Sequence, residues 1–278
     1  MNIAVVGLGL IGGSLAKALN SRTGHSVFGA DLNEETMLLA RLSGAIDAPL
    51  TDENLKDMDL VLIAIRPMAA ISWAKEHFSG MKKGACVVDM CGVKREVTEK
   101  MEKYASDSGI LYVGGHPMAG KERGKFQNAA EDLFVGASMI LTPGKDTAPD
   151  TLENLNNLFT DIGFARIVFT TPDEHDRIIA YTSQLAHIAS SAYIKSPEAL
   201  RQRGFSAGSF RDMTRVAFMD EDMWTELFLL NADYLTEQVH LLIENLMEYE
   251  QALENRDADK LRMLLRDGRE MKTRAGGN

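Results

Sequence analysis

The order of apolar and polar residues divides the chain into two parts. Over roughly the first 170 residues, short apolar runs alternate with segments whose apolar residues recur at helical spacing. Such alternation is typical of a doubly wound, mostly parallel sheet whose strands are covered on both faces. The pattern predicts strands at 3–6, 27–30, 60–65, 86–89, 110–113, 138–141 and 165–169, and helices at 13–20, 34–43, 69–77, 94–106 and 149–161.

Beyond residue 171 the sequence has no strand pattern, and apolar residues recur at helical spacing. This spacing predicts a long helix over 173–195, one or two helices over 223–254 and a last helix over 257–272. We therefore expect an α/β domain over residues 1–170 and an all-helical domain over residues 171–278. The helical domain leaves two arrangements open, a self-contained core and a homodimer formed through its long amphipathic helices, and we favour the homodimer.

Charge and cysteine content narrow the classes of function. The chain has 30 Lys and Arg against 40 Asp and Glu, a net charge of −10. This balance argues against nucleic-acid and anionic membrane surfaces as partners, but it does not exclude a small anionic ligand. We expect no signal peptide, and the sequence has no apolar run of the ~20 residues that a membrane span needs. With only Cys86 and Cys91, we expect free thiols and a cytoplasmic location.

A glycine-rich segment follows the first predicted strand and opens the first predicted helix. Gly7, Gly9 and Gly12 match the G-x-G-x-x-G pattern, in which the helix start binds a pyrophosphate and the domain is Rossmann-like. Asp31 lies 19 residues beyond Gly12, where an acid accepts hydrogen bonds from a ribose and repels a 2′-phosphate, so NAD is the predicted cofactor. The predicted cofactor-binding residues are Gly7, Gly9, Leu10, Ile11, Gly12 and Asp31.

One histidine stands out as a candidate catalytic residue. His116 lies between glycines and a proline directly after the strand at 110–113, which predicts a constrained loop at the carboxyl edge of the sheet. An imidazole with an ordinary pKa near 6.5 can accept a proton from a hydroxyl group at neutral pH. We expect His116 to be the general base and expect no metal.

Several separate motifs support a family resemblance that spans nearly the whole chain. The segment 116–120 with Glu122, the pair His175-Asp176, then His187, the segment 208–215, Trp224 and Asn231 resemble the prephenate dehydrogenase family, which includes arogenate dehydrogenases. The resemblance implies NAD-dependent oxidative decarboxylation of prephenate to 4-hydroxyphenylpyruvate, on the route to tyrosine. Hydride leaves the ring carbinol carbon while His116 holds the hydroxyl proton, and loss of CO2 makes the ring aromatic.

The resemblance also implies which residues bind the dianionic substrate. Arg215 matches an arginine that binds the ring carboxylate, and Arg211 matches a basic position near the side-chain carboxylate. His187 is expected to approach the substrate, and Glu122 to lie at the pocket mouth. From spacing alone, surface ion pairs with Asp212, Asp220 or Glu221 would be the more typical role of both arginines.

Two positions depart from the family pattern. Many members carry a serine that contacts the catalytic histidine, and Gly92 stands at that position here. We therefore predict that a backbone group or a water molecule orients His116. Gln184 stands where some relatives have a second histidine, so a histidine at this position is not essential to the chemistry.

Two other functions compete with the main hypothesis. An arogenate dehydrogenase would act on a substrate with an ammonium group, which Arg211 disfavours. A non-catalytic NAD-binding sensor would share the glycine motif but would have no need for both His116 and Arg215. We expect no room for a chorismate mutase-like or regulatory domain, and feedback by tyrosine is left open.

Overall fold

The computed structural model describes residues 1–121 and 124–276. The chain forms two compact units, Met1–Asn231 and Ala232–Asn278. The first unit joins the sheet to the helices that follow it, as far as Asn231. These two units are defined by spatial compactness and not by the sequence pattern. The domain boundary near residue 170 therefore stays a prediction.

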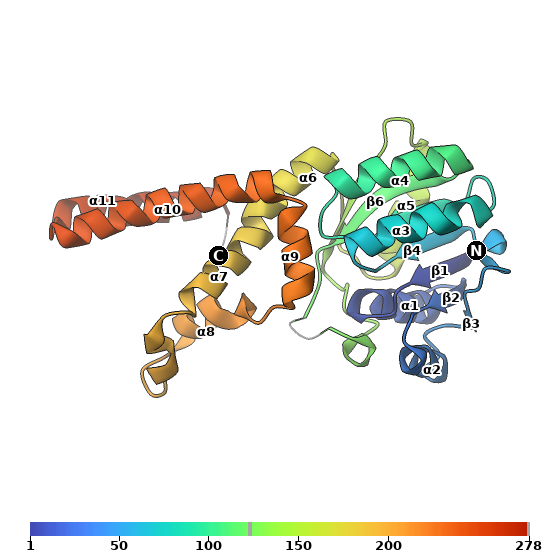
Figure 1. Ribbon diagram of the computed structural model, residues 1–278, viewed down its shortest axis with the longest axis horizontal. Coiled ribbons are helices and arrows are strands. Elements are labelled where there is room, and N and C mark those ends of the chain that lie inside the picture. Colours follow the sequence, from blue (N-terminus) through green and yellow to red (C-terminus); the bar gives the residue numbers. More distant parts are fainter. Residues whose placement is uncertain (122–123, 277–278) are drawn as a thin grey trace. The chain divides into compact units, whose positions relative to one another are not determined.

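An eight-stranded sheet forms the core of the first unit, in the order β3-β2-β1-β4-β5-β6-β7-β8 (Figure 1). All neighbouring strands are parallel except β6 and β7, so the predicted mostly parallel sheet is confirmed. The chain runs outward from β1 in both directions, which makes the β1/β4 boundary a switch point where such sheets bind ligands. The strands are β1 (Asn2–Val6), β2 (Ser26–Ala30), β3 (Ala48–Pro49), β4 (Leu60–Ile63), β5 (Cys86–Asp89), β6 (Leu111–Pro117), β7 (Ser138–Pro143) and β8 (Arg166–Phe169).

The strand β6 differs from the expectation in a way that matters for the site. Residues 114–117 were expected to form a loop, but they continue the strand because β7 pairs with them. His116 lies opposite Ile140 in this antiparallel pair. The candidate base therefore sits on a hydrogen-bonded strand, which restrains its backbone more firmly than a loop does.

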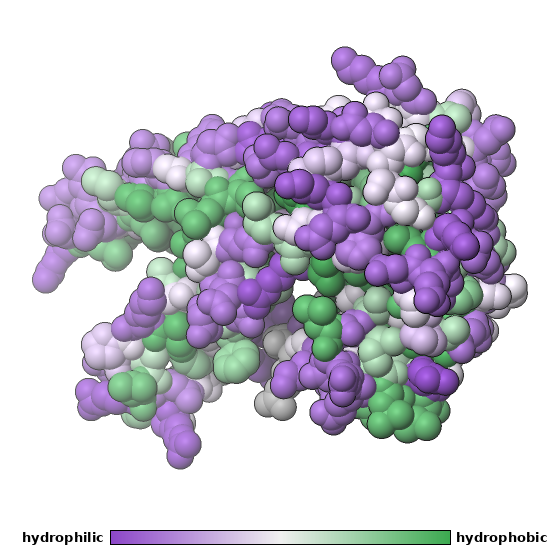
Figure 2. All heavy atoms as spheres, turned by 45° about the vertical axis from the view of Figure 1, so that its right-hand side comes forward, coloured by the Kyte–Doolittle hydropathy of each residue, from purple (hydrophilic) through white to green (hydrophobic). Residues whose placement is uncertain are grey.

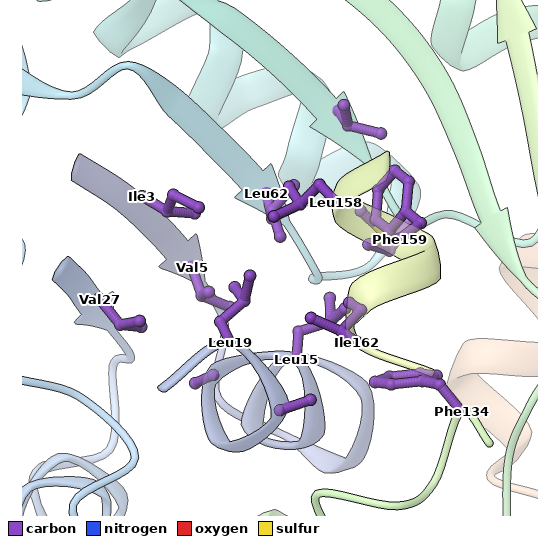
Figure 3. Close-up of a cluster of buried hydrophobic side chains, with 14 of the residues drawn as sticks. Ile3, Val5, Leu15, Leu19, Val27, Leu62, Phe134, Leu158, Phe159 and Ile162 are labelled. Atoms are coloured by element: carbon purple, nitrogen blue, oxygen red, sulfur yellow. The ribbon is translucent and has the colours of Figure 1, made fainter. Parts of the chain in front are cut away.

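Helices cover both faces of the sheet and explain why its strands are so apolar. On one face, β1 and β4 pack against α1, α2 and α5 through fully buried aliphatic and aromatic side chains (Figure 3). On the other face, α3 and α4 pack through residues such as Ala70, Val97 and Met101. The helices are α1 (Leu10–Arg22), α2 (Glu34–Leu42), α3 (Pro67–His77), α4 (Arg95–Ser108) and α5 (Pro149–Asp161).

The long helix expected over 173–195 is interrupted. It consists of α6 (Pro172–Ile179), a π-helical turn (Ala180–Leu185) and α7 (Ala186–Tyr193). Thr171 caps its start by accepting a hydrogen bond from the Glu174 backbone N–H. After α7 come α8 (Gly208–Thr214) and α9 (Glu221–Leu229), which complete the first unit.

The second unit is a hairpin of two helices, α10 (Ala232–Glu254) and α11 (Ala258–Arg274). The Tyr249 hydroxyl donates to the Leu264 carbonyl, and Lys260 pairs with Glu248 at 2.7 Å. Large apolar side chains gather along the hairpin (Figure 2), and several of them, among them Leu241, Ile243, Leu246, Met247, Leu253 and Leu265, are exposed. No helix within 1–121 and 124–276 is long and apolar enough to cross a membrane.

Candidate active site

The turn between β1 and α1 contains three glycines with different physical roles. Gly7 has φ +84°, and a Cβ there would lie 2.7 Å from the Ala64 carbonyl oxygen. A Cβ on Gly12 would lie 1.8 Å from the Gly7 carbonyl oxygen. At Gly9, by contrast, a Cβ would meet no atom within 4 Å. Packing therefore explains Gly7 and Gly12, whereas at Gly9 the backbone faces open space.

The start of α1 is suited to bind an anion. Gly9 occupies the N-cap position, no side chain caps the helix, and the first turn carries no acidic residue. The first N–H groups of a helix have no intrahelical partner, and the helix dipole favours negative charge there. This turn fits a pyrophosphate, because no side chain caps the first N–H groups of α1 and a Cβ at Gly9 would meet no atom within 4 Å.

Asp31 lies just beyond β2, beside the same turn. One carboxylate oxygen, Oδ2, accepts a hydrogen bond from the Leu8 N–H at 2.8 Å, and Oδ1 accepts from the Asn33 N–H at 2.9 Å. Each oxygen keeps a further lone pair for a ribose hydroxyl. The glycine turn thus holds the carboxylate where the sequence pattern expects it.

The His116 ring is held by a chain of buried side chains. Its Nδ1 lies 2.9 Å from Nε2 of His175, and Nδ1 of His175 lies 2.7 Å from Oδ1 of Asp176. His175 and Asp176 are almost fully buried at the start of α6. The prediction of a backbone or water partner for His116 is therefore wrong, because the ring contacts an imidazole from the helical segment.

Burial sets the protonation state of this pair. It lowers the pKa of His116 well below 6.5, and the neighbouring His175 and Lys94 act in the same direction. Burial also lowers the pKa of His175, partly opposed by its hydrogen bond to Asp176. Both rings are consequently neutral at neutral pH, which is the state that a base needs before it accepts a proton.

Asp176 is anchored from several directions. Its two oxygens accept the backbone N–H groups of Lys94 at 2.7 Å and Arg95 at 2.9 Å, at the start of α4. Its backbone carbonyl accepts from Nδ2 of the buried Asn231, which also donates to Oε1 of Gln184 at 2.8 Å. Gln184 thus has a structural role within the π-helical turn.

A second buried network lies beneath the histidine. Lys94 and Asp89 are both 0% exposed and form an ion pair. Asp89 also accepts from the Tyr112 hydroxyl at 2.6 Å and from the Cys91 N–H at 2.8 Å. A buried ion pair is stable only when further donors satisfy its carboxylate, as the Tyr112 hydroxyl and the Cys91 N–H do here. The hydrogen bond from Tyr112 also joins the end of β5 to β6.

Gly92 lies next to the other nitrogen of the His116 ring. A Cβ on Gly92 would lie 3.8 Å from His116 Nε2 and 3.4 Å from a methyl group of Leu227 on α9. The position that carries serine in many relatives therefore does face the histidine, and here it leaves Nε2 without a side-chain hydroxyl.

The remaining expected substrate residues belong to the helical segment. The rings of His187 and Trp224 contact each other with centroids 3.8 Å apart and a tilt of 31° between their planes. The charge of Arg215 lowers the pKa of His187, although burial of that ring is the larger cause. These three residues are thus brought together. Arg211 is exposed and lies 4.0 Å from Asp212, and Glu122 lies outside the described residues.

The helix α9 links this group to His116 and to the sheet. Trp224 and Leu227 both lie on α9, so the same helix contacts His187 and the Gly92 position. Glu226 accepts the Met68 N–H at 2.7 Å at the start of α3. Sequence reasoning missed His175 as the partner of His116; the His175-Asp176 pair carried the signal, but its register against β6 is set by tertiary packing.

Comparison with known proteins agrees with this geometry. A family model described as "Prephenate dehydrogenase, nucleotide-binding domain" matches residues 15–169, and one described as "Prephenate dehydrogenase, dimerization domain" matches residues 171–267. The chain belongs to the prephenate dehydrogenase family. The resemblance inferred from the sequence motifs is therefore confirmed.

Individual relatives match most of the chain. Prephenate dehydrogenase of Bacillus subtilis is 31% identical over 93% of this chain and 72% of its own length. Cyclohexadienyl dehydrogenase of Zymomonas mobilis is 30% identical over 94% of this chain and 91% of its own length. The structure of Aquifex aeolicus prephenate dehydrogenase with hydroxyphenyl propionate and NAD+ is similar with a TM-score of 0.88 at 25% identity, covering 99% of this chain and 98% of that one. Arogenate dehydrogenase of Synechocystis has a TM-score of 0.83 at 26% identity, covering 99% and 100%.

Proposed function

We propose that this chain catalyses the NAD-dependent oxidative decarboxylation of prephenate to 4-hydroxyphenylpyruvate, a step of tyrosine biosynthesis. The observation that carries the proposal is the neutral imidazole of His116, whose Nε2 faces the Gly92 position at the carboxyl edge of the sheet. Family membership supports the same activity. The similar prephenate dehydrogenase of Aquifex aeolicus was solved with NAD+, which supports NAD as the cofactor.

The residues that would hold NAD are those of the glycine turn and Asp31. The backbone N–H groups at Gly9, Leu10 and Ile11 would bind the pyrophosphate, and the Asp31 carboxylate would accept a hydrogen bond from the ribose. When bound, NAD supplies the hydride acceptor. Gly7 and Gly12 act indirectly, because they let the turn and α1 pack closely enough to form the site.

His116 performs the proton chemistry. Its Nε2 accepts a hydrogen bond from the carbinol hydroxyl of prephenate and holds that proton as the carbon–hydrogen bond breaks. Loss of CO2 then completes an aromatic ring, and the proton can return to the ring oxygen. A positioned base of this kind contributes about 10²–10⁴ in rate.

Arg215 is the proposed partner of the ring carboxylate. Its charge lowers the pKa of His187, whose ring contacts Trp224. Arg211 is exposed, and we assign it the side-chain carboxylate of prephenate, with His187 contacting the substrate. Two local arginines can bind the dianionic substrate even though the chain as a whole has a net charge of −10.

NADH formation on adding prephenate is the direct test, with arogenate assayed alongside. We expect His116→Asn to abolish turnover while the dissociation constant for NAD stays unchanged, because His116 does not belong to the glycine turn. Arg215→Ala should raise the KM for prephenate. A strong preference for arogenate would contradict the proposed substrate, and wild-type turnover in His116→Asn would contradict the proposed base.

We further propose a homodimer that works in the cytoplasm. The match to a dimerization domain over residues 171–267 and the exposed apolar residues of the α10–α11 hairpin support association through the helices. The two free thiols, Cys86 and Cys91, are typical of a reducing compartment. Mass measurement in solution tests the dimer.

A further inference from the structure

The hydrogen-bond chain behind His116 has a direction that follows from its terminal carboxylate. Asp176 accepts the backbone N–H groups of Lys94 and Arg95, which can only donate. An ionised carboxylate likewise only accepts. The ring nitrogen of His175 that lies 2.7 Å from Asp176, Nδ1, must therefore carry the hydrogen in this contact.

The same reasoning fixes the position of the hydrogen on both imidazole rings. A neutral imidazole has one protonated nitrogen, so with hydrogen on Nδ1 the Nε2 of His175 is an acceptor. His116 Nδ1 lies 2.9 Å from that acceptor and must donate to it. The hydrogen of His116 is thereby placed on Nδ1, and the lone pair is left on Nε2, the nitrogen that faces the Gly92 position.

We infer that His175, oriented by Asp176, is a positioning residue that selects the reactive tautomer of His116. This inference rests on the proposed role of His116 as the base. In this chain the serine that contacts the histidine in many relatives is replaced by Gly92, so tautomer selection is made from the Nδ1 side of the ring.

The chain of contacts positions a proton and does not conduct it away. His175 is 2% exposed and Asp176 is 0% exposed, and the contacts of Asp176 are to α4 and to the buried Asn231. No step delivers a proton to solvent along this path. That agrees with chemistry in which the hydroxyl proton is held during hydride loss and then returned to the oxygen.

Two substitutions at one position separate the acceptor from the donor. In His175→Gln the longer amide places an oxygen near the former Nε2, so an acceptor for His116 remains. In His175→Asn the shorter amide still donates to Asp176 but does not reach His116. We expect His175→Asn to lower kcat by about 10²-fold and His175→Gln by less than about tenfold, with similar KM for prephenate and similar NAD affinity in both.

The tautomer itself is measured by long-range 1H–15N correlation spectra of the 15N-histidine-labelled protein without substrate. The chain has six histidines, and the His116 signals are assigned by their loss in His116→Asn. We expect an unprotonated Nε2 on His116 in the wild type and in His175→Gln, and a population with protonated Nε2 in His175→Asn.

The outcomes distinguish this inference from the proposed function. A protonated Nε2 on His116 in the wild type overturns the inference, as do equal kcat values in the two His175 variants or an unchanged spectrum in His175→Asn. If His116→Asn itself turns over prephenate normally, the role of the base fails instead. Loss of folding in both His175 variants would show as matched falls in melting temperature, and the wild-type spectrum then decides alone.

Discussion

The glycine turn allows binding and folding to be separated by two substitutions three residues apart. Gly12→Ala places a methyl group 1.8 Å from the Gly7 carbonyl oxygen and 3.1 Å from Cβ of Ala64. The first contact is to backbone, so α1 has to shift away from the sheet. Overpacking of this kind costs about 1–3 kcal/mol.

Gly9→Ala should leave the fold intact. A Cβ there meets no atom within 4 Å, and the backbone is at φ −69° and ψ −150°, in the extended region. The weaker N-cap of alanine is offset by the lower entropy of the unfolded chain, so we expect a stability change within about 1 kcal/mol. The methyl group does occupy the space through which a pyrophosphate approaches the amides. Losing one charged hydrogen bond, worth about 1.5–3 kcal/mol, weakens NAD binding about 10- to 100-fold.

Calorimetric titration with NAD and thermal unfolding of the apoprotein measure the two effects. Gly9→Ala should bind NAD weakly at an unchanged melting temperature, whereas Gly12→Ala should lose about 2–4 °C for each kcal/mol. Wild-type NAD affinity in Gly9→Ala would refute the placement of the pyrophosphate. Equal losses of melting temperature in both variants would refute the distinction between an open and a packed glycine.

Two further predictions concern buried charge. Because burial lowers the pKa of His116 well below 6.5, the ring stays neutral as the pH falls through 6.5, so kcat/KM for prephenate should stay level there and decline only at lower pH; a decline centred at 6.5 or above contradicts this. Lys94→Met leaves the buried Asp89 carboxylate without its cation, and chemical denaturation should show a loss of about 3–5 kcal/mol. Asp89→Asn added to Lys94→Met should recover part of that loss.

Much of the architecture was predictable because it depends on local pattern. Apolar runs bounded by Gly, Asp or Pro indicated the strands, and the spacing of Gly7, Gly9, Gly12 and Asp31 indicated the cofactor turn. The two-residue β3 carries no periodic pattern of its own, and β6 was predicted to end before Gly114 because glycines usually break strands. Pairing with β7, which is a non-local contact, keeps that segment extended.

By itself the sequence determined the fold class and the family, and it indicated the proposed cofactor turn and His116 as the candidate base, since each motif that carries these predictions is local in the chain. Only the tertiary structure decided what holds His116, because the contact with His175 joins residues 59 positions apart. Nothing in local periodicity encodes the register between the end of β6 and the start of α6. That register is set by packing and by the requirement that buried donors and acceptors be paired. It is this requirement that orders Asp176, His175 and His116 into one chain.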